Sequence, residues 1–261
     1  MTIGIEIVDH VAVIEMQDPP HNFLSIDQVG GVAEALESFD DDPQVRAAVL
    51  CAQGRSFCAG ANFGGDDGPL GGASRGEPVG GDATLALYQS AARLCEVSTP
   101  FIAAVQGPAI GGGLGLAMTA TMRIAAPEAR FSANFAALGI HQGFGLSVLL
   151  PEILGPTRAA EVLLTAKRYN GEEAMAIGLA DRCVPLEQLR DEAIRTAAEI
   201  AVNAPLAIRA INTTLRSGLG DRVRAATRHE AEQQLALSST ADAAEGIRAV
   251  SERRPGHFTG T

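Results

Sequence analysis

Hydrophobic and polar residues alternate near the N-terminus in the pattern of half-buried strands. The alternation runs from Ile3 to Ile7 and resumes from Val11 to Ile14 after a short turn. The next stretch repeats at helical spacing, and Asp27 is placed to cap that helix. The apolar positions of this helix are Val29, Val32, Ala33 and Leu36. Residues 47–51 are then continuously apolar, which predicts a buried strand.

The middle of the chain predicts further strands and helices in alternation. Residues 63–82 are rich in glycine and poor in apolar side chains, so we expect a long mobile loop there. The elements expected after it are a helix carrying Leu85, Leu87, Ala91 and Leu94, a strand over 101–105, a helix over 112–121 and a strand over 122–125. Such alternation is typical of an α/β fold with parallel strands.

The pattern becomes mainly helical after about residue 144. The expected helices open at Pro156, run over 186–202, open at Pro205, start at a cap on Asp221, and run over 241–252. Proline and aspartate are both favoured at helix starts, which is why they set these boundaries. We therefore expect a mixed core over residues 1–200 and a helical lobe over residues 201–261, with no flexible linker between them.

Charge and cysteine usage narrow the class of protein. The chain has 31 acidic and 20 basic residues and a net charge of −11, which disfavours nucleic-acid binding. Its N-terminus has no signal run, and no apolar stretch reaches the roughly 18 residues that span a bilayer. The four cysteines show no metal-ligand spacing. We expect a cytoplasmic protein with no membrane partner and no metal.

Two glycine-rich turns follow predicted strands, at residues 54–62 and 107–115. Such turns leave backbone N–H groups free where a helix starts, and small residues let a ligand approach them. Two turns that face each other can direct two N–H groups at one oxygen, as in an oxyanion hole for a thioester enolate. Each turn alone is also consistent with simple helix–sheet packing. The second turn matches neither a phosphate loop nor a dinucleotide fingerprint, which disfavours a nucleotide-dependent oxidoreductase.

Seven segments, in order, carry a resemblance over nearly the whole chain. They are HNFLS (21–25), GRSFCAGAN (54–62), TPFIAAVQGPAIGGGLGLAM (99–118), ARFSANFAALGI (129–140), LPEILGPTRAAEVLLT (150–165), GEEAMAIGLADRCVP (171–185) and AVSERRPGHF (249–258). The sequence resembles the crotonase (enoyl-CoA hydratase/isomerase) family. The resemblance implies a crotonase-like ββα spiral core and a homotrimer or dimer of trimers. It also implies an acyl-CoA substrate, with coenzyme A as part of that substrate and no other cofactor.

The resemblance assigns roles to positions around the two turns. The N–H groups of Ala61 and Gly112 would form the oxyanion hole. The positions implied for the substrate pocket are Asn62, Phe63, Gly115 and Phe135. The positions implied for coenzyme A are Phe23, Arg55 and Ala59.

Two of these positions depart from the family pattern. Hydratases of the family have glutamates where this chain has Gly115 and Phe135. Because water addition needs acid and base groups, straightforward 2-enoyl-CoA hydration is not expected. His141 is the best replacement acid or base, since by resemblance its turn faces the acyl pocket and histidine titrates near neutral pH. It is equally consistent with packing or with a bond to a loop carbonyl. Acids of the glycine-rich segment are expected to face solvent, and they are Asp66, Asp67, Glu77 and Asp82.

The sequence leaves two functions open. One is an enzyme of acyl-CoA or fatty-acid metabolism, a lyase, isomerase or hydrolase that forms a thioester oxyanion without the two glutamates. Hydrolysis, decarboxylation and cleavage of a β-keto thioester all fit that description. The other is a non-catalytic acyl-CoA-binding protein. We favour the enzyme.

Overall fold

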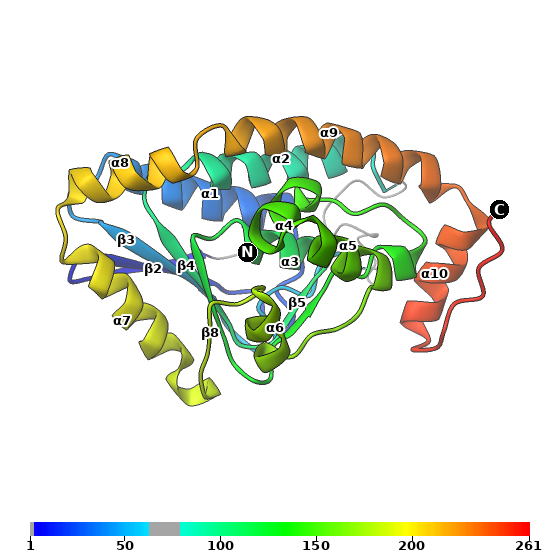
Figure 1. The fold of residues 1–261 in the computed structure, drawn as a ribbon, viewed down its shortest axis with the longest axis horizontal. Helices are drawn as coiled ribbons and strands as arrows, with labels where there is room; N and C mark the ends of the chain where they lie inside the picture. Colours follow the sequence, from blue (N-terminus) through cyan, green and yellow to red (C-terminus); the bar gives the residue numbers. More distant parts are fainter. Residues whose placement is uncertain (1–2, 63–78) are drawn as a thin grey trace.

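A computed structural model describes residues 3–62 and 79–261 (Figure 1). Within these residues, six strands form one sheet in the order β1-β2-β3-β4-β6-β8. The strands are β1 (Ile3–Val8), β2 (Val11–Met16), β3 (Ala47–Ala52), β4 (Phe101–Val105), β6 (Met122–Ala125) and β8 (Arg182–Cys183). All neighbours pair in parallel except β1 and β2, which are antiparallel. The predicted α/β fold with parallel strands is confirmed.

Helices cover both faces of this sheet. The helices that matter here are α1 (Ile26–Asp40), α2 (Asp82–Glu96) and α7 (Leu189–Ala201). Successive side chains of a strand point to opposite faces. Ile14 and Leu50 therefore join the main core with α1 and α2, while Val13 and Val49 pack against α7. Because both faces are covered, β4 is buried along its whole length, which explains its continuous apolar sequence.

A second, smaller sheet was not predicted from the sequence. It pairs β5 (Pro108–Ile110) with β7 (Arg130–Ser132) in parallel. Single bridges extend it on both sides, from Cys58 to Ala109 and from Phe131 to Tyr169. Four chain segments therefore lie side by side, in the order of Cys58, Ala109, Phe131 and Tyr169. Strands of three residues carry too little periodicity to be recognised in a sequence.

Several helix boundaries differ from the predictions. Ser25, not Asp27, caps α1, because its hydroxyl accepts the Gln28 N–H at 3.2 Å. Gly218, not Asp221, precedes the helix that begins at Leu219. The remaining helices are α3 (Gly112–Met118), α4 (Leu146–Leu154), α5 (Pro156–Thr165), α6 (Gly171–Ile177), α8 (Pro205–Leu215), α9 (Leu219–Ser238) and α10 (Ala241–Ser251), with 3-10 turns η1 (Ala136–Leu138) and η2 (Leu186–Gln188). The helix expected over 112–121 is therefore shorter, and α4 and α6 were not predicted.

The C-terminal helices pack onto the core. Figure 1 shows α9 running alongside α2, with α10 at the far end of the molecule. Gln89 of α2 donates to the Thr227 hydroxyl of α9 at 3.2 Å, and Arg224 pairs with Glu96. At the other end, α10 approaches η1 so closely that a Cβ on Gly246 would lie 2.4 Å from the Leu138 carbonyl carbon. The helices of the expected lobe, residues 201–261, therefore pack directly against residues of the expected core, residues 1–200.

None of the helices in residues 3–62 and 79–261 has the length and apolar character needed to cross a membrane. Of the expected loop over 63–82, residues 63–78 lie outside the described part of the chain, and Asp82 is the first residue of α2. Asp66, Asp67 and Glu77 lie in that undescribed part.

Candidate active site

The two glycine turns pack directly against each other. The Cys58 N–H donates to the Pro108 carbonyl at 3.0 Å, and the Ile110 N–H donates to the Cys58 carbonyl at 3.1 Å. A Cβ on Gly113 would lie only 2.2 Å from the Cys58 carbonyl oxygen. Gly60 has φ +80°, and a Cβ there would lie 2.6 Å from the Ile110 carbonyl oxygen. Only glycine permits this approach, and the close packing brings the ends of both turns together.

A buried asparagine holds the first turn. The Asn22 side-chain amide donates to the Gln53 carbonyl at 2.7 Å and to the Ser56 carbonyl at 2.8 Å. Its oxygen accepts the Asp18 N–H at 3.0 Å, and the residue is 0 % exposed. Asn22 belongs to the HNFLS segment, and no role was predicted for it from the sequence. The available signal was a polar residue between apolar ones, since a buried amide must be hydrogen-bonded.

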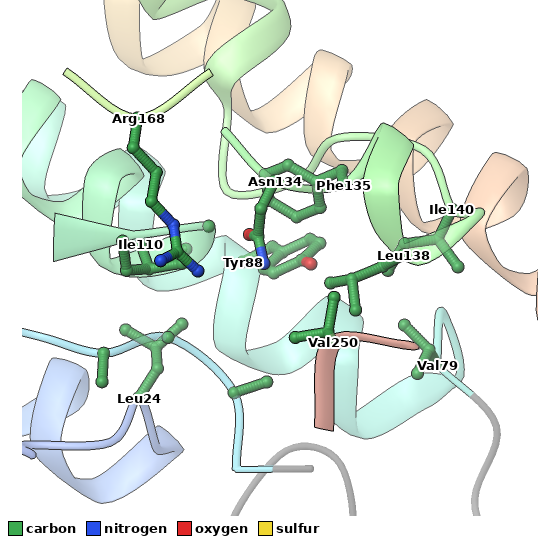
Figure 2. A pocket seen from close by; sticks show the side chains of 15 residues that line it. Leu24, Val79, Tyr88, Ile110, Asn134, Phe135, Leu138, Ile140, Arg168 and Val250 are labelled. Carbon is green, nitrogen blue, oxygen red and sulfur yellow. The ribbon is translucent and has the colours of Figure 1, made fainter. Parts of the chain in front are cut away.

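Ala61 and Gly112 border the same cavity, whose volume is about 230 Å³ (Figure 2). Gly112 is the first residue of α3, so its N–H has no partner within the helix. Within the described residues, neither the Ala61 N–H nor the Gly112 N–H donates a backbone hydrogen bond. The two N–H donors expected from the sequence, those of Ala61 and Gly112, thus border one cavity, as an oxyanion hole requires.

Apolar side chains form most of the cavity wall. They are Leu24, Val79, Ile110, Phe135, Leu138, Ile140 and Val250. Figure 2 shows the polar side chains of Tyr88, Asn134 and Arg168 among them. Of the residues that the structure describes, no carboxylate and no histidine lines this cavity. The cavity therefore offers hydrogen-bond donors and one cation, but no general base of the usual kinds.

Gly115 lies under a phenylalanine ring. A Cβ on Gly115 would lie 2.7 Å from Cδ1 and 2.8 Å from Cβ of Phe144, which is 0 % exposed. The side chain of a glutamate at position 115 would need the space that Phe144 occupies. The Phe144 ring also meets the Tyr88 ring edge-on, with centroids 6.0 Å apart. Gly115 was expected to line the pocket, but this packing excludes it from the cavity wall.

A buried carboxylate holds Phe144 in place. Phe144 has φ 60°, a strained value for a residue with a side chain. Glu230 of α9 accepts the Gly145 N–H at 2.8 Å and the Ser147 N–H at 2.9 Å, just after Phe144. Glu230 is 0 % exposed, and burial raises the pKa of its carboxyl. The two accepted bonds fix the turn that presents Phe144 to Gly115.

Phe135 stands at the cavity wall, as expected from the sequence. It is 6 % exposed, and its ring approaches Gly111 so that a Cβ there would lie 3.7 Å from Phe135 Cζ. The side chain of Phe135 therefore supplies an apolar surface beside the second turn. It has no group that can exchange a proton.

His141 does not line the cavity, although its turn was expected to face the acyl group. The Ile140 N–H bonds the Phe135 carbonyl at 3.1 Å, and the Ile140 side chain enters the cavity wall. The next residue, His141, has Nδ1 2.8 Å from the Gln142 carbonyl oxygen, and its ring meets that of His229 with centroids 5.9 Å apart. His141 thus adopts the packing and carbonyl-bonding alternative, and the structure gives no support for its role as the base.

Tyr88 is a cavity residue that sequence analysis missed. Its hydroxyl donates to Gln234 Oε1 at 3.0 Å, and Gln234 Nε2 donates to the His141 carbonyl at 2.7 Å. Both Tyr88 and Gln234 are buried, and burial raises the pKa of the Tyr88 hydroxyl. Tyr88 is therefore a neutral phenol fixed by α9. In the sequence, a tyrosine on the apolar face of a helix is interpreted as a core residue. Only the contact between α2 and α9 shows that Tyr88 reaches the cavity.

The three positions expected to contact coenzyme A lie on neighbouring segments. Ala59 lines the cavity, and its N–H donates to the His21 carbonyl at 3.0 Å. The His21 ring lies beside the Phe23 ring, with centroids 5.1 Å apart, and its Nε2 is 3.5 Å from the exposed Arg55 guanidinium. The outer side of the first turn thus carries an aromatic and basic surface next to the cavity.

The remaining predicted positions give little further information. Asn62 is half-buried beside Ala61. Phe63 lies outside the described residues. Within the described ranges, no three His, Cys, Asp or Glu side chains are arranged to hold a metal ion. Burial raises the pKa of Cys58, behind the first turn, to about 12, so this thiol stays neutral.

Comparison with known proteins agrees with the fold. The family model described as enoyl-CoA hydratase/isomerase matches residues 6–261. A crotonyl-CoA hydratase of Syntrophomonas wolfei is 34 % identical over 259 residues, covering 98 % of this chain and 97 % of the relative. A carnitinyl-CoA dehydratase of Proteus mirabilis is 33 % identical over 220 residues, covering 83 % of this chain and 82 % of the relative.

Solved structures show the same fold. The crystal structure of an enoyl-CoA hydratase/isomerase from Pseudoalteromonas atlantica superposes with a TM-score of 0.84 at 26 % identity, covering 99 % of this chain and 100 % of that one. The chain belongs to the enoyl-CoA hydratase/isomerase (crotonase) family. The expected crotonase-like fold is confirmed.

Proposed function

We propose that this protein binds an acyl-CoA thioester and stabilises an oxyanion formed from it at the N–H groups of Ala61 and Gly112. The observation that carries the proposal is that both residues border one cavity, on two turns locked together by glycine contacts. The thioester carbonyl would point at the two N–H groups, which stabilise negative charge most strongly in a site that excludes water. The coenzyme A moiety of the bound thioester would extend out of the cavity past Ala59 and along the surface formed by Phe23 and Arg55.

The proposed reaction is not the two-carboxylate addition of water. Phe144 fills the space at Gly115, and Phe135 supplies only an apolar ring. A reaction that forms a thioester oxyanion without a side-chain base in the cavity fits better. Hydrolysis, decarboxylation and cleavage of a β-keto thioester pass through such species. In hydrolysis, water would add to the thioester carbon and the coenzyme A thiol would leave. In decarboxylation, CO2 would leave its bonding electron pair in the thioester enolate, which water would protonate. In cleavage of a β-keto thioester, water would add to the β-keto carbon and the thioester enolate would depart and be protonated.

The sharpest test is a panel of acyl-CoAs analysed by mass spectrometry. The purified protein is incubated with saturated, 2-enoyl, 3-hydroxy and 3-keto thioesters, and binding of each is measured by calorimetry. We expect saturable binding of thioesters, tighter than that of free coenzyme A, and turnover of a member other than the 2-enoyl class. Failure of every thioester to bind would refute the proposal.

A non-catalytic acyl-CoA-binding protein is the second candidate. It is favoured by one observation, the lack of a carboxylate or histidine among the described residues that line the cavity. In the same panel, this candidate predicts that thioesters bind and are recovered unchanged.

We also propose that the chain assembles into a homotrimer or a dimer of trimers. Several large apolar side chains of α8 are exposed, and they are Leu206, Ile211 and Leu215. Burial of such a stripe against another chain is favourable. Light scattering on the eluted protein would give the mass, and a monomer at micromolar concentration would contradict the assembly.

A further inference from the structure

Arg168 stands at one end of a row of polar groups on the cavity rim. The small sheet orders its segments as Cys58, Ala109, Phe131 and Tyr169. A residue close in sequence to each of these four lines the cavity with a polar group. The first two supply the N–H groups of Ala61 and Gly112, and the last two supply the side chains of Asn134 and Arg168.

The Arg168 guanidinium has no anionic partner in the described part of the chain. No salt bridge or hydrogen bond there involves it, although the chain has 31 acidic residues against 20 basic ones. Its neighbour Lys167, by contrast, pairs with Glu173 at 3.5 Å and lies 4.7 Å from the centre of the Tyr169 ring. In an acidic protein, an arginine held at a cavity without a partner among the described residues is available to a ligand.

The direction of the Arg168 side chain agrees with a role in binding a ligand. Figure 2 shows the Arg168 side chain descending into the space between Ile110 and Asn134, rather than away from the cavity. The Asn134 amide points into the same space. A planar guanidinium with an amide beside it offers several N–H donors, which suits a carboxylate.

We propose that Arg168, with Asn134, selects an acyl-CoA whose acyl group carries a carboxylate. The inference rests on the proposed function, because the thioester carbonyl must lie at Ala61 and Gly112 for the acyl group to reach this end of the row. Coenzyme A is not the group expected at Arg168. The surface formed by Phe23 and Arg55 adjoins the first segment of the row, and Arg168 belongs to the last.

The chain offers a matched set of variants for the test. Arg168→Met removes the charge and keeps the length of the side chain, and Arg168→Lys restores a charge without the planar fork. Lys167→Met removes the neighbouring charge, which does not line the cavity. The probes are succinyl-CoA and butyryl-CoA, which share a four-carbon chain and differ in the terminal carboxylate, and free coenzyme A.

Calorimetry should show that wild-type protein prefers succinyl-CoA to butyryl-CoA. Arg168→Met should weaken succinyl-CoA binding by roughly 10-fold or more, the range for a hydrogen bond to a charged group. It should leave butyryl-CoA and free coenzyme A unchanged, Arg168→Lys should recover part of the loss, and Lys167→Met should match the wild type. The preference should also shrink as salt is raised, because Arg168 is exposed.

Two results would overturn the inference and leave the proposed function standing. In one, Arg168→Met weakens all three probes equally, which would make Arg168 a contact for the phosphates of coenzyme A. In the other, wild-type protein binds both thioesters with equal affinity. Failure of wild-type protein to bind either thioester would instead refute the proposed function itself.

Discussion

Phe144 and Gly115 fit against each other so closely that position 115 has no room for a side chain. A Cβ on Gly115 would lie 2.7 Å from Phe144 Cδ1, and Phe144 is fully buried and fixed by the bonds from Glu230 to the next turn. The glycine and the phenylalanine thus form one packing unit. In this chain the space that an acid at position 115 would use belongs to the core.

The packing of Phe144 against Gly115 predicts that substitutions at these two positions have non-additive effects on stability. Gly115→Ala should lower the free energy of unfolding by roughly 1–3 kcal/mol, the usual cost of overpacking a core. In a Phe144→Gly background, the same change should cost nothing or stabilise, since alanine is the better helix former and both the ring and the Cβ of Phe144 are gone. Urea unfolding of the four proteins of this cycle measures the coupling.

Gly30 supplies the control for that cycle. It lies in α1, and a Cβ there would meet nothing within 4 Å. Gly30→Ala should therefore be neutral or stabilising by up to about 1 kcal/mol in both backgrounds. Equal costs for Gly115→Ala in the wild-type and Phe144→Gly backgrounds would show that the Phe144 side chain is not the obstacle.

The Ala61 N–H can be removed by one substitution. Ala61→Pro deletes this donor, and we expect kcat on the acyl-CoA found in the panel to fall by roughly 100–1,000-fold, with a smaller change in KM. Ala61→Ser keeps the N–H and should retain most of the activity. Steady-state kinetics and circular dichroism of both variants are needed. Retention of kcat in a correctly folded Ala61→Pro protein would remove this N–H from the mechanism.

Tyr88 is predicted to stay neutral in alkali until the protein unfolds, and Tyr169 to ionise at higher pH than in the unfolded chain. Burial raises the pKa of Tyr88 and of Tyr169, whereas tyrosines of the unfolded chain ionise near pH 10. Below about pH 9, both states are protonated and the two groups contribute no pH dependence. As pH rises past about 10, the unfolded state loses these protons more readily than the folded state, so the stability of the fold falls.

Ultraviolet absorbance of tyrosinate, recorded with circular dichroism, checks this prediction. The tyrosinate signal should rise together with the loss of helix, and Tyr169→Phe should leave the Tyr88 part coupled to unfolding. A titration centred on pH 10 in protein that is still folded would contradict the buried position of Tyr88.

Three of the four thiols should be unreactive in the folded protein. Burial raises the pKa of Cys51 and Cys95 to about 11 and that of Cys58 to about 12, and the thiolate is the reactive form. Cys183 is only half-buried. At pH 8 a thiol reagent should therefore modify Cys183 first, and the other three only after denaturation. Modification of Cys58 in folded Cys183→Ser protein would show that the first turn opens.

Much of the fold could be read from the sequence, because long elements leave a strong pattern. The continuous apolar runs of β3 and β4 and the helical spacing in α1 each follow from burial on one or both faces. The small sheet could not be read, since β5 and β7 have three residues each. The Ser25 cap was also missed, because Ser25 and Asp27 are both good caps and only the backbone geometry decides between them.

The residues of the candidate site also fall into those that could be predicted from the sequence and those that could not. The glycine spacing located the two turns, since close approach of two backbones leaves glycine as the only choice, and the family resemblance pointed to Ala61 and Gly112 within them. Tyr88, Asn134 and Arg168 were not located, because their roles come from segments distant in sequence that meet at the cavity. His141 was assigned to the cavity by its place in a turn, and the bond between Ile140 and Phe135 places the preceding residue there instead.

The most direct test of the account is the rate at which wild-type protein adds water to 2-butenoyl-CoA, followed by mass spectrometry beside calorimetric binding of the same thioester. With Phe144 over Gly115 and no carboxylate among the described cavity residues, we expect the thioester to bind and to gain no water above the uncatalysed rate. Rapid formation of the hydrated thioester would contradict the account, because it would require an acid and a base that the described cavity does not contain.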